Sequence, residues 1–313
     1  MSYGIAMDVG TTTIWGSLVD TASKQEIARE IIINPQKAWG ADVVTRMTRN
    51  FSKLRRALKV ELNNLILSLC HKGNILLKDV RHILVVSNAV IDLYLKGEKA
   101  FERLPIISKY VGSDALAGAL YADLDKIKSN QILIDLGTNA EMVLSKKGRL
   151  YILSAAAGPA FGHLGSEWIA VIAELLKEGK ISKTGKLARK DITRGILKVT
   201  QKKVRDLQLA KAAVRAGLEI LLKEARLKAT QLKKIMLAGT FGSLVKPAAA
   251  KRIGMIPNAF TEAIGNSALE GAKKILFDRD NLKRIKKIKN RIKFIELANH
   301  KDFPQIFIEE INF

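Results

Sequence analysis

The chain has 313 residues, of which 48% are apolar and 6% aromatic, and its 53 Lys and Arg against 30 Asp and Glu give a formal charge of +23. Its length is sufficient for two medium-sized domains with buried cores. No apolar run reaches the roughly 18 residues that a membrane helix needs, and the first residues begin a strand rather than a secretory leader. We therefore expect a cytoplasmic protein with no membrane partner.

Cysteine and histidine content limits the metal chemistry. Cys70 is the single cysteine, so no intrachain disulfide can form, and an iron–sulfur cluster is normally held by four thiolates. The histidines His71, His82, His163 and His300 have none of the usual zinc spacings. We therefore expect no iron–sulfur cluster on this chain.

So basic a chain raises the question of nucleic-acid binding. Lys and Arg are spread along the sequence, and in the dense stretches 198–205 and 283–293 they alternate with Ile, Leu or Val, as in solvated amphipathic elements. There is no aromatic interleaving for base stacking and no helix-turn-helix, zinc-finger or RNP motif. We do not expect nucleic acid as a partner; an acidic protein partner, or simply a basic proteome, accounts for the charge better.

The first motif in chain order follows the strand-like run Tyr3–Met7 and reads Asp8-Val9-Gly10-Thr11-Thr12-Thr13. A similar motif occurs a second time as Asp135-Leu136-Gly137-Thr138-Asn139-Ala140-Glu141, after the run Gln131–Ile134 and before a further strand-like run. An acid at a strand end, then glycine and hydroxyl side chains, makes a tight hairpin whose N–H groups can face a phosphate. The carboxylate can hold water on a magnesium ion. The matched pair indicates a duplicated fold that binds one polyphosphate from both sides.

Between the two motifs, the spacing of five leucines predicts a long helix over Val43–Leu69 with one buried face. A buried strand is expected over Val80–Val86, and a helix rich in alanine and leucine from Gly112 to Leu120. The segment 124–130 is short and polar. We place the domain boundary there, which gives a first domain at 1–128 and a second at 129–313.

A segment rich in small residues, Ala155–His163, follows the second hairpin and contains Gly158 and Pro159. Glycines in such density allow close approach of another backbone or of a ligand. The segment is either a tight crossover or part of the site, and its position after the hairpin favours the site. An amphipathic helix follows from Asp206, with an apolar face that includes Leu207 and Val214.

Two further glycine-containing segments lie in the last third of the chain. The strand Lys234–Ala238 leads into Gly239-Thr240-Phe241-Gly242, a turn that lets a base or ribose lie against bare backbone. A helix beyond it has Pro247 in its first turn. The run Gly265–Ala272 is a helix start of small residues, the kind that packs closely against another helix.

In this order the motifs resemble those of the actin, sugar-kinase and Hsp70 superfamily of ATPases. The resemblance implies an α/β fold of two ribonuclease H-like domains with an interdomain ATP cleft, and a helix at 260–280 that packs back on the first domain. Asp8–Thr13 and Asp135–Glu141 would be the two phosphate loops, and Gly239–Gly242 the adenosine loop. The chain has no Gly-x-x-x-x-Gly-Lys-Ser/Thr motif of the other large ATPase class.

Within that superfamily the chain is similar throughout to the ATPase domain of the reductive activators of corrinoid-dependent proteins. Those activators use ATP hydrolysis to help drive an uphill electron transfer onto cob(II)alamin in a methyl-transferring corrinoid protein. The resemblance implies ATP and Mg²⁺ as cofactors, a corrinoid protein as partner and, because the activators act as dimers, a homodimer. It is carried by Asn34-Pro35-Gln36, Gly40–Arg46, Tyr110–Asp114, Ala156–Phe161, Gln208–Ala213 and the ending 296–313.

Some features depart from that family. Members of known activity carry an iron–sulfur domain on the same polypeptide, usually ahead of the ATPase, whereas Met1 here almost adjoins the first motif. We therefore expect this domain to be missing and any electrons to come from a separate iron–sulfur chain. Gly162-His163 replaces a usual Glu-Gly pair, Ser154 a common cysteine, and Lys203 a usual acid.

The expected site is assigned on these motifs. Asp8 would hold magnesium through water, Asp135 would either assist the metal, again through water, or orient the attacking water, and Glu141 is either a water-orienting or a structural residue. Such catalysis depends on positioning and electrostatics and needs no covalent nucleophile. The residues expected to contact the nucleotide are Gly10, Thr11, Thr12, Thr13, Gly137, Thr138, Asn139, Gly158, Pro159, Gln208, Lys211, Gly239, Thr240, Phe241 and Gly242.

The leading hypothesis is thus an ATP-hydrolysing component that activates a corrinoid protein, and two alternatives stay open. A small-molecule kinase of the sugar-kinase type would need a carboxylate as base near the acceptor hydroxyl, for which Asp114 is the available loop acid. A non-catalytic ATP-sensing docking protein would bind the nucleotide without turnover.

Overall fold

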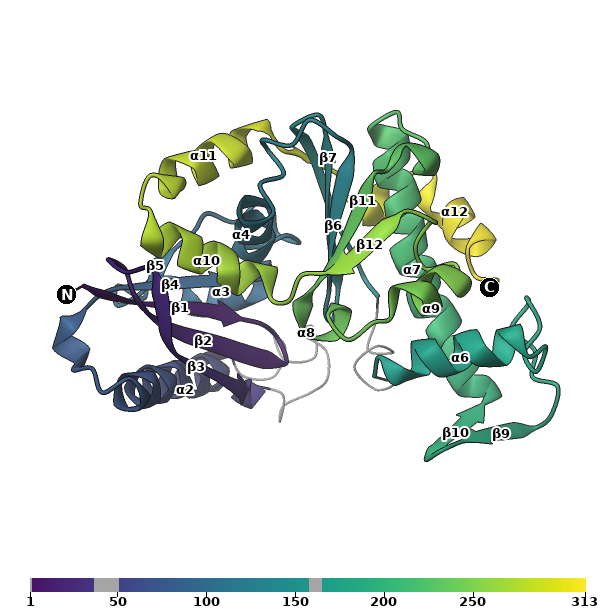
Figure 1. Ribbon diagram of the computed structural model, residues 1–313, viewed down its shortest axis with the longest axis horizontal. Helices are drawn as coiled ribbons and strands as arrows, with labels where there is room; N and C mark the ends of the chain where they lie inside the picture. Colours follow the sequence, from purple (N-terminus) through teal and green to yellow (C-terminus); the bar gives the residue numbers. More distant parts are fainter. Residues whose placement is uncertain (1, 37–50, 158–164) are drawn as a thin grey trace. The chain divides into compact units, whose positions relative to one another are not determined.

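The computed structural model describes residues 2–36, 51–157 and 165–313 (Figure 1). The chain divides into two compact units. Unit 1 consists of Met1–Asp123 together with Ser267–Arg291, and unit 2 of Leu124–Asn266 together with Ile292–Phe313. Residues 124–128 therefore belong to unit 2, and a segment late in the chain belongs to unit 1.

Unit 1 contains β1 (Tyr3–Val9), β2 (Thr13–Asp20), β3 (Gln25–Ile33), β4 (Val80–Ser87) and β5 (Glu102–Arg103), in the sheet order β3-β2-β1-β4-β5. The first three strands pair antiparallel, whereas β4 pairs parallel with β1 and β5 parallel with β4. The strand expected over Val80–Val86 is confirmed, although only its second half, from Leu84 onward, is buried.

Helix α2 (Phe51–Lys72) covers one face of this sheet, and its buried leucines pack with Ile5, Met7 and Ile14. The predicted leucine face is confirmed, because every member of the series is at most 2% exposed: Leu54, Leu58, Leu62, Leu65 and Leu69. Residues 43–50, the expected start of this helix, lie outside the described residues.

The opposite face carries α4 (Ser113–Tyr121) and α10 (Ser267–Phe277), since Leu276 of α10 contacts Gly4, which alternates along β1 with Ile5. The small residues of α10 permit a close approach to α4: a Cβ at Gly271 would lie 2.0 Å from the carbonyl oxygen of Ala117. The predicted close packing of this helix is thus confirmed. Unit 1 also contains α3 (Ala89–Leu95), α11 (Asn281–Arg291) and a 3₁₀ turn at Leu77–Asp79.

Unit 2 contains β6 (Gln131–Leu136), β7 (Ala140–Lys146), β8 (Arg149–Ala155), β11 (Lys234–Ala238), β12 (Phe260–Ala263) and β13 (Lys293–Phe294), in the sheet order β12-β11-β6-β7-β8-β13. Its helices are α6 (Glu167–Lys177), α7 (Gln201–Glu224), α8 (Gly239–Gly242), α9 (Pro247–Arg252) and α12 (Phe303–Glu309). A separate hairpin joins β9 (Asp191–Arg194) to β10 (Leu197–Thr200), and 3₁₀ turns lie at Ala229–Gln231 and Leu297–Asn299.

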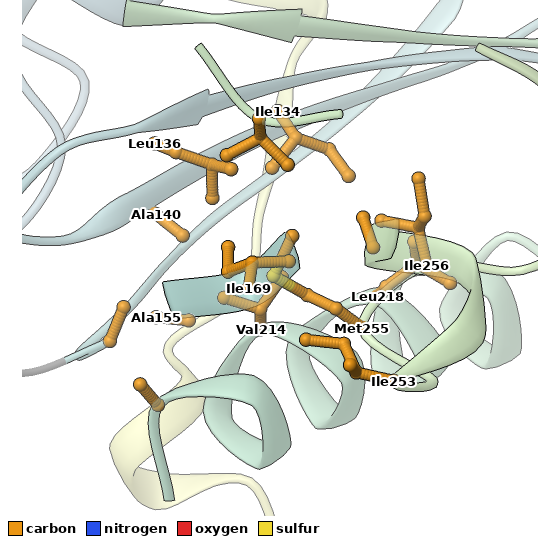
Figure 2. Close-up of a cluster of buried hydrophobic side chains, with 14 of the residues drawn as sticks. Ile134, Leu136, Ala140, Ala155, Ile169, Val214, Leu218, Ile253, Met255 and Ile256 are labelled. Atoms are coloured by element: carbon orange, nitrogen blue, oxygen red, sulfur yellow. The ribbon is translucent and has the colours of Figure 1, made fainter. Parts of the chain in front are cut away.

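The core of unit 2 fills the space between one face of its sheet and the helices. Apolar side chains of β6, β7 and β8 meet those of α6, α7 and the turn after α9, as Figure 2 shows. The labelled members are Ile134, Leu136, Ala140, Ala155, Ile169, Val214, Leu218, Ile253, Met255 and Ile256.

The two sheets repeat one topology, which confirms the duplication predicted from the paired motifs. In unit 1 a β1–β2 hairpin continues antiparallel into β3, and β4 lies parallel to β1. In unit 2 a β6–β7 hairpin continues antiparallel into β8, and β11 lies parallel to β6. Within the described ranges, no helix is long and apolar enough to span a bilayer.

Candidate functional site

The first predicted phosphate loop is a tight turn between β1 and β2. Asp8 pairs with Trp15 one step before the last ladder pair, and the Gly10 amide donates to the Thr13 carbonyl at 3.0 Å. A Cβ at Gly10 would lie 2.9 Å from that oxygen, so a side chain there would crowd the turn. Thr12 is exposed, while Thr11 and Thr13 are partly buried, which leaves the hydroxyl side of the loop accessible.

Asn34, just after β3, braces this loop from within. It is fully buried. Its backbone N–H donates to the Thr12 carbonyl at 2.9 Å, and its side-chain Nδ2 donates to the Gly10 carbonyl at 2.8 Å. The Gln36 amide in turn donates to Asn34 Oδ1 at 2.9 Å. Two carbonyls of the turn are therefore held toward the protein. The sequence indicated Asn34 only as part of the Asn34-Pro35-Gln36 motif and contained no signal for this role, because its hydrogen bonds reach a turn more than 20 positions earlier.

The second predicted loop joins β6 to β7, and its two acids face each other. Asp135 pairs directly with Glu141 in the antiparallel ladder, so their Cβ atoms lie about 4.5–5.5 Å apart on one face of the sheet. The Gly137 amide donates to the Asn139 carbonyl at 2.8 Å, and Ser154 of β8 donates to Glu141 Oε1 at 3.1 Å. Opposed like charges are unfavourable, and a bound cation with its water shell would relieve the repulsion.

Gly239 brings the predicted adenosine loop to the same place. β11 pairs parallel with β6, with Ala238 beside Asp135, and Gly239 follows with φ of +84°. A Cβ at Gly239 would lie only 2.2 Å from Asp135 Oδ1, so the bare backbone lies against the carboxylate. The structure therefore brings Asp135, Glu141 and Gly239 together. Beyond it, Thr240 is exposed, while Phe241 is partly buried against the core of unit 2.

Gln208 and Lys211 of α7 make a different set of contacts. Lys211 Nζ donates to the carbonyls of Glu310 and Asn312, both at 2.7 Å, and Gln208 Nε2 donates to the Ile311 carbonyl at 3.1 Å. Burial lowers the pKa of the Lys211 ammonium, although the Glu310 carboxylate raises it. These hydrogen bonds tie the C-terminal segment to α7, and their nucleotide role remains a prediction. Gly158 and Pro159 lie outside the described residues.

The carboxylates of the site suit a cation held largely through water. In the part of the chain that the structure describes, no group of three His, Cys, Asp or Glu side chains is arranged to hold a metal ion. Mg²⁺ usually keeps several waters and binds through one or two carboxylates together with phosphate oxygens. A pair of carboxylates such as Asp135 and Glu141 fits this behaviour.

A further acid, Asp114, lies in the first turn of α4. Burial raises its pKa from 3.8 to about 6, although the Ala115 amide acts in the other direction, donating to Oδ1 at 2.7 Å. A carboxyl group with this pKa can take up a proton near neutral pH. The sequence indicated Asp114 as a loop acid but contained no signal for this shift.

Two family models match the chain. The C-terminal domain of RACo, the ASKHA domain, matches residues 129–163 and 162–313, and the RACo middle region matches residues 3–102. Among curated proteins, the corrinoid activation enzyme RamQ of Eubacterium limosum is 26% identical, over 98% of this chain and 69% of its own length. The Co(II) methylated amine-specific corrinoid protein reductase of Methanosarcina barkeri is 22% identical, over 99% of this chain and 77% of its own length.

Among solved structures, the reductive activator for corrinoid,iron-sulfur protein superposes with a TM-score of 0.86 at 24% identity. The match covers 100% of this chain and 66% of that one. The chain thus spans about two thirds of that structure's length, and the likeness confirms the predicted fold class.

Proposed function

Because the chain belongs to the RACo family, with the ASKHA-domain model matching residues 129–163 and 162–313, we propose that it binds and hydrolyses Mg-ATP to activate a corrinoid protein. The observation that carries the proposal is the arrangement around Asp135, which lies opposite Glu141 and against the backbone of Gly239. Two facing carboxylates beside a bare backbone suit a hydrated cation and a nucleotide.

Each hairpin has its own part in this proposal. Bound Mg²⁺ would supply positive charge against the phosphates. In each hairpin the strand-end acid, Asp8 or Asp135, would orient water on the metal, and backbone N–H groups and the hydroxyls of Thr11 and Thr138 would donate to phosphate oxygens. Glu141 shares a sheet face with Asp135 and is the second candidate for orienting the attacking water.

The electrons for the proposed reaction would not come from a cluster held by these 313 residues. Within these 313 residues Cys70 is the sole cysteine, it is buried, and burial raises the pKa of its thiol. A lone buried thiol does not hold an iron–sulfur cluster. We propose that the electrons come from an iron–sulfur centre outside this stretch of sequence, and that ATP turnover here couples to the reduction of cob(II)alamin in a corrinoid partner.

The first experiment measures Mg-ATP binding and hydrolysis. Saturating ATP at about 100 times its Kd should stabilise the wild-type protein by roughly 2.7 kcal/mol. Asp135→Asn and Glu141→Gln should reduce kcat, the first on the order of 100-fold, with folding intact. Asp79→Asn and Glu174→Gln remove exposed carboxylates elsewhere and should behave as wild type. Unchanged turnover in Asp135→Asn would overturn the site assignment.

The second experiment tests the partner. A corrinoid protein in its cob(II) state is mixed with a reduced ferredoxin, Mg-ATP and the protein, and formation of cob(I)alamin is followed by absorbance. Reduction should require both the protein and hydrolysable ATP, and should fail with Asp135→Asn. ATP turnover that no corrinoid protein changes, together with no cobalt reduction, would remove the activator function and leave only an ATPase.

One observation favours the kinase alternative. Burial raises the pKa of Asp114 to about 6, which is the range of a general base acting near neutral pH. Incubating a panel of hexoses with ATP labelled at the γ-phosphate distinguishes a kinase from an ATPase. A kinase transfers the labelled phosphate to the sugar, whereas an ATPase transfers it to water.

A further inference from the structure

A groove in unit 1 lies where the segment after β5 faces α11. It is lined by Arg103, Leu104, Pro105 and Ile106 on one side, by Lys286, Lys289 and Asn290 of α11 on the other, and by Asp92 of α3. Its volume of about 590 Å³ is within the range of binding pockets. The groove thus combines an apolar side with a basic side, and none of these residues belongs to the candidate nucleotide site.

The groove carries an excess of positive charge. Asp92, its one acid, is paired with Arg103 at 2.9 Å. Among the described residues, no carboxylate lies within ion-pairing distance of Lys286 or Lys289, whereas Arg284 on the same helix is paired with Asp123 at 2.7 Å. The groove therefore presents two ammonium groups without a counter-ion from the described chain.

The helix that carries these lysines is fixed in place. Ile285 and Ile288 are at most 2% exposed, and the Arg284–Asp123 pair anchors the same turn. Lys286 and Lys289 are three residues apart, so they lie on one side of the helix with Cβ atoms about 5–6 Å apart. This spacing approaches the roughly 6.6 Å between alternate residues of an extended segment.

We propose that the groove between α11 and the segment after β5 is the docking surface for an acidic segment of a partner protein. Two carboxylates at alternate positions pair with Lys286 and Lys289, while an apolar side chain of the partner lies on Pro105 and Ile106. A protein segment suits the groove better than nucleic acid, because its lining offers an apolar wall and, in the described structure, no aromatic ring for base stacking.

The wider charge of the chain supports such docking. Lys287 and Arg291 extend the basic surface along α11 and, within the described ranges, have no carboxylate partner either. A basic surface of this size steers an acidic protein toward the groove, and the steering weakens as salt screens it over a Debye length of about 10 Å at 0.1 M. Only the identification of the partner as the corrinoid protein rests on the proposed function.

The test compares two double charge reversals. K286E/K289E changes the groove, and K53E/R56E makes the same change of charge at the same spacing on α2, on the other face of the sheet. Lys53 and Arg56 are exposed and, in the described structure, have no carboxylate partner. The probes are a labelled eight-residue peptide of alternating Glu and Leu, its Gln–Leu counterpart and an eight-residue oligothymidylate, measured by fluorescence anisotropy at two salt concentrations.

The Glu–Leu peptide should bind the wild type in preference to both other probes, and K286E/K289E should weaken its binding at least 10-fold, against less than 2-fold for K53E/R56E. Equal losses in the two variants would show non-specific charge attraction, and a preference of the groove for oligothymidylate would show a nucleic-acid site. Either result overturns the proposal.

Failure of this proposal and failure of the proposed function give different results. K286E/K289E should retain wild-type ATP hydrolysis and lose binding of the corrinoid protein. A corrinoid protein that binds the wild type and K286E/K289E equally would overturn the docking surface while leaving the activator function intact. If no corrinoid protein binds the wild type, the peptide experiment still decides whether the groove takes an acidic segment.

Discussion

The backbone of Gly239 lies against the carboxylate of Asp135. A Cβ built on Gly239 would come 2.2 Å from Asp135 Oδ1 and 2.9 Å from the Leu136 carbonyl oxygen. The contact exists because β11 is the parallel neighbour of β6, which puts Ala238 beside Asp135. Two motifs far apart in the sequence are thereby brought together, and glycine is favoured at 239 both by this contact and by its φ of +84°.

Gly239→Ala should therefore damage both stability and nucleotide binding. The unfavourable backbone conformation should cost of order 1–3 kcal/mol, and displacement of the Asp135 carboxylate should abolish the stabilisation by Mg-ATP. Chemical unfolding with and without Mg-ATP measures both effects. Gly195→Ala is the matched control, because Gly195 also has positive φ but has open space around its Cβ position. Equal responses of the two variants to ATP would contradict the role given to the contact.

Asn34→Ala should loosen the first loop. It removes the bond from Nδ2 to the Gly10 carbonyl and leaves the Gln36 amide without its Oδ1 acceptor. Unsatisfied buried groups cost about 1–3 kcal/mol each. Asn34→Asp keeps the acceptor for the Gln36 amide but buries a carboxylate against the Gly10 carbonyl oxygen, so unfolding measurements at pH 7 should show it at least as destabilised as Asn34→Ala. Full stability in Asn34→Ala would show that the side chain does not hold the turn.

The sequence predicted the two hairpins because their signals are local. Asp-x-Gly-Thr after an apolar strand specifies a turn within a few residues, and the leucine spacing of α2 specifies a buried face at helical periodicity. Asn34 escaped the site prediction because its partners, Gly10 and Thr12, lie more than 20 positions earlier, in the turn between β1 and β2.

The contacts of α7 are a second case in which a local sequence pattern does not predict the partner of a side chain. Gln208 and Lys211 are predicted as nucleotide ligands from a resemblance, and that stays a prediction. No local signal predicted that their side chains also reach carbonyls about a hundred positions later in the chain. Local pattern predicted the helix that carries them. Whether a polar residue on it meets a ligand or another part of the chain depends on the tertiary fold of the C-terminal segment.

Gly271→Ala should destabilise unit 1 strongly, although alanine favours helices over glycine by about 1 kcal/mol. The added Cβ would lie 2.0 Å from the Ala117 carbonyl oxygen, so α10 would have to move away from α4, with an overpacking cost of about 1–3 kcal/mol or more. Gly217→Ala in α7 is the control, because its Cβ would meet side-chain atoms at 3.2–3.3 Å. A thermal melt should show a much larger loss for Gly271→Ala, and similar melts would argue against close packing of α10 on α4.

Asp114→Asn should stabilise the protein in a pH-dependent way. Burial raises the pKa of Asp114 from 3.8 to about 6, so between about pH 4 and pH 6 the unfolded chain releases a proton that the folded protein keeps, and stability falls as pH rises. Above pH 6 the accumulated cost is at most about 3 kcal/mol, at 1.36 kcal/mol per pKa unit. Asn keeps an acceptor for the Ala115 amide but carries no charge. Urea unfolding should show Asp114→Asn more stable than the wild type at pH 8, with the difference shrinking toward pH 4.

Glu26→Gln should change the stability at pH 8 in the opposite direction to Asp114→Asn. It therefore serves as a control for a general effect of pH on unfolding. Burial raises the pKa of Glu26, but hydrogen bonds from Arg29, Lys273 and Ser17 outweigh it and lower the pKa from 4.5 to about 2. This ionised carboxylate stabilises the folded protein above pH 4.5, and the contribution is lost as pH falls toward 2. Glu26→Gln should therefore be less stable than the wild type at pH 8, with the deficit closing in acid. Because the substitutions act in opposite directions at pH 8, a shared sign would contradict the environment described for one of the two carboxylates.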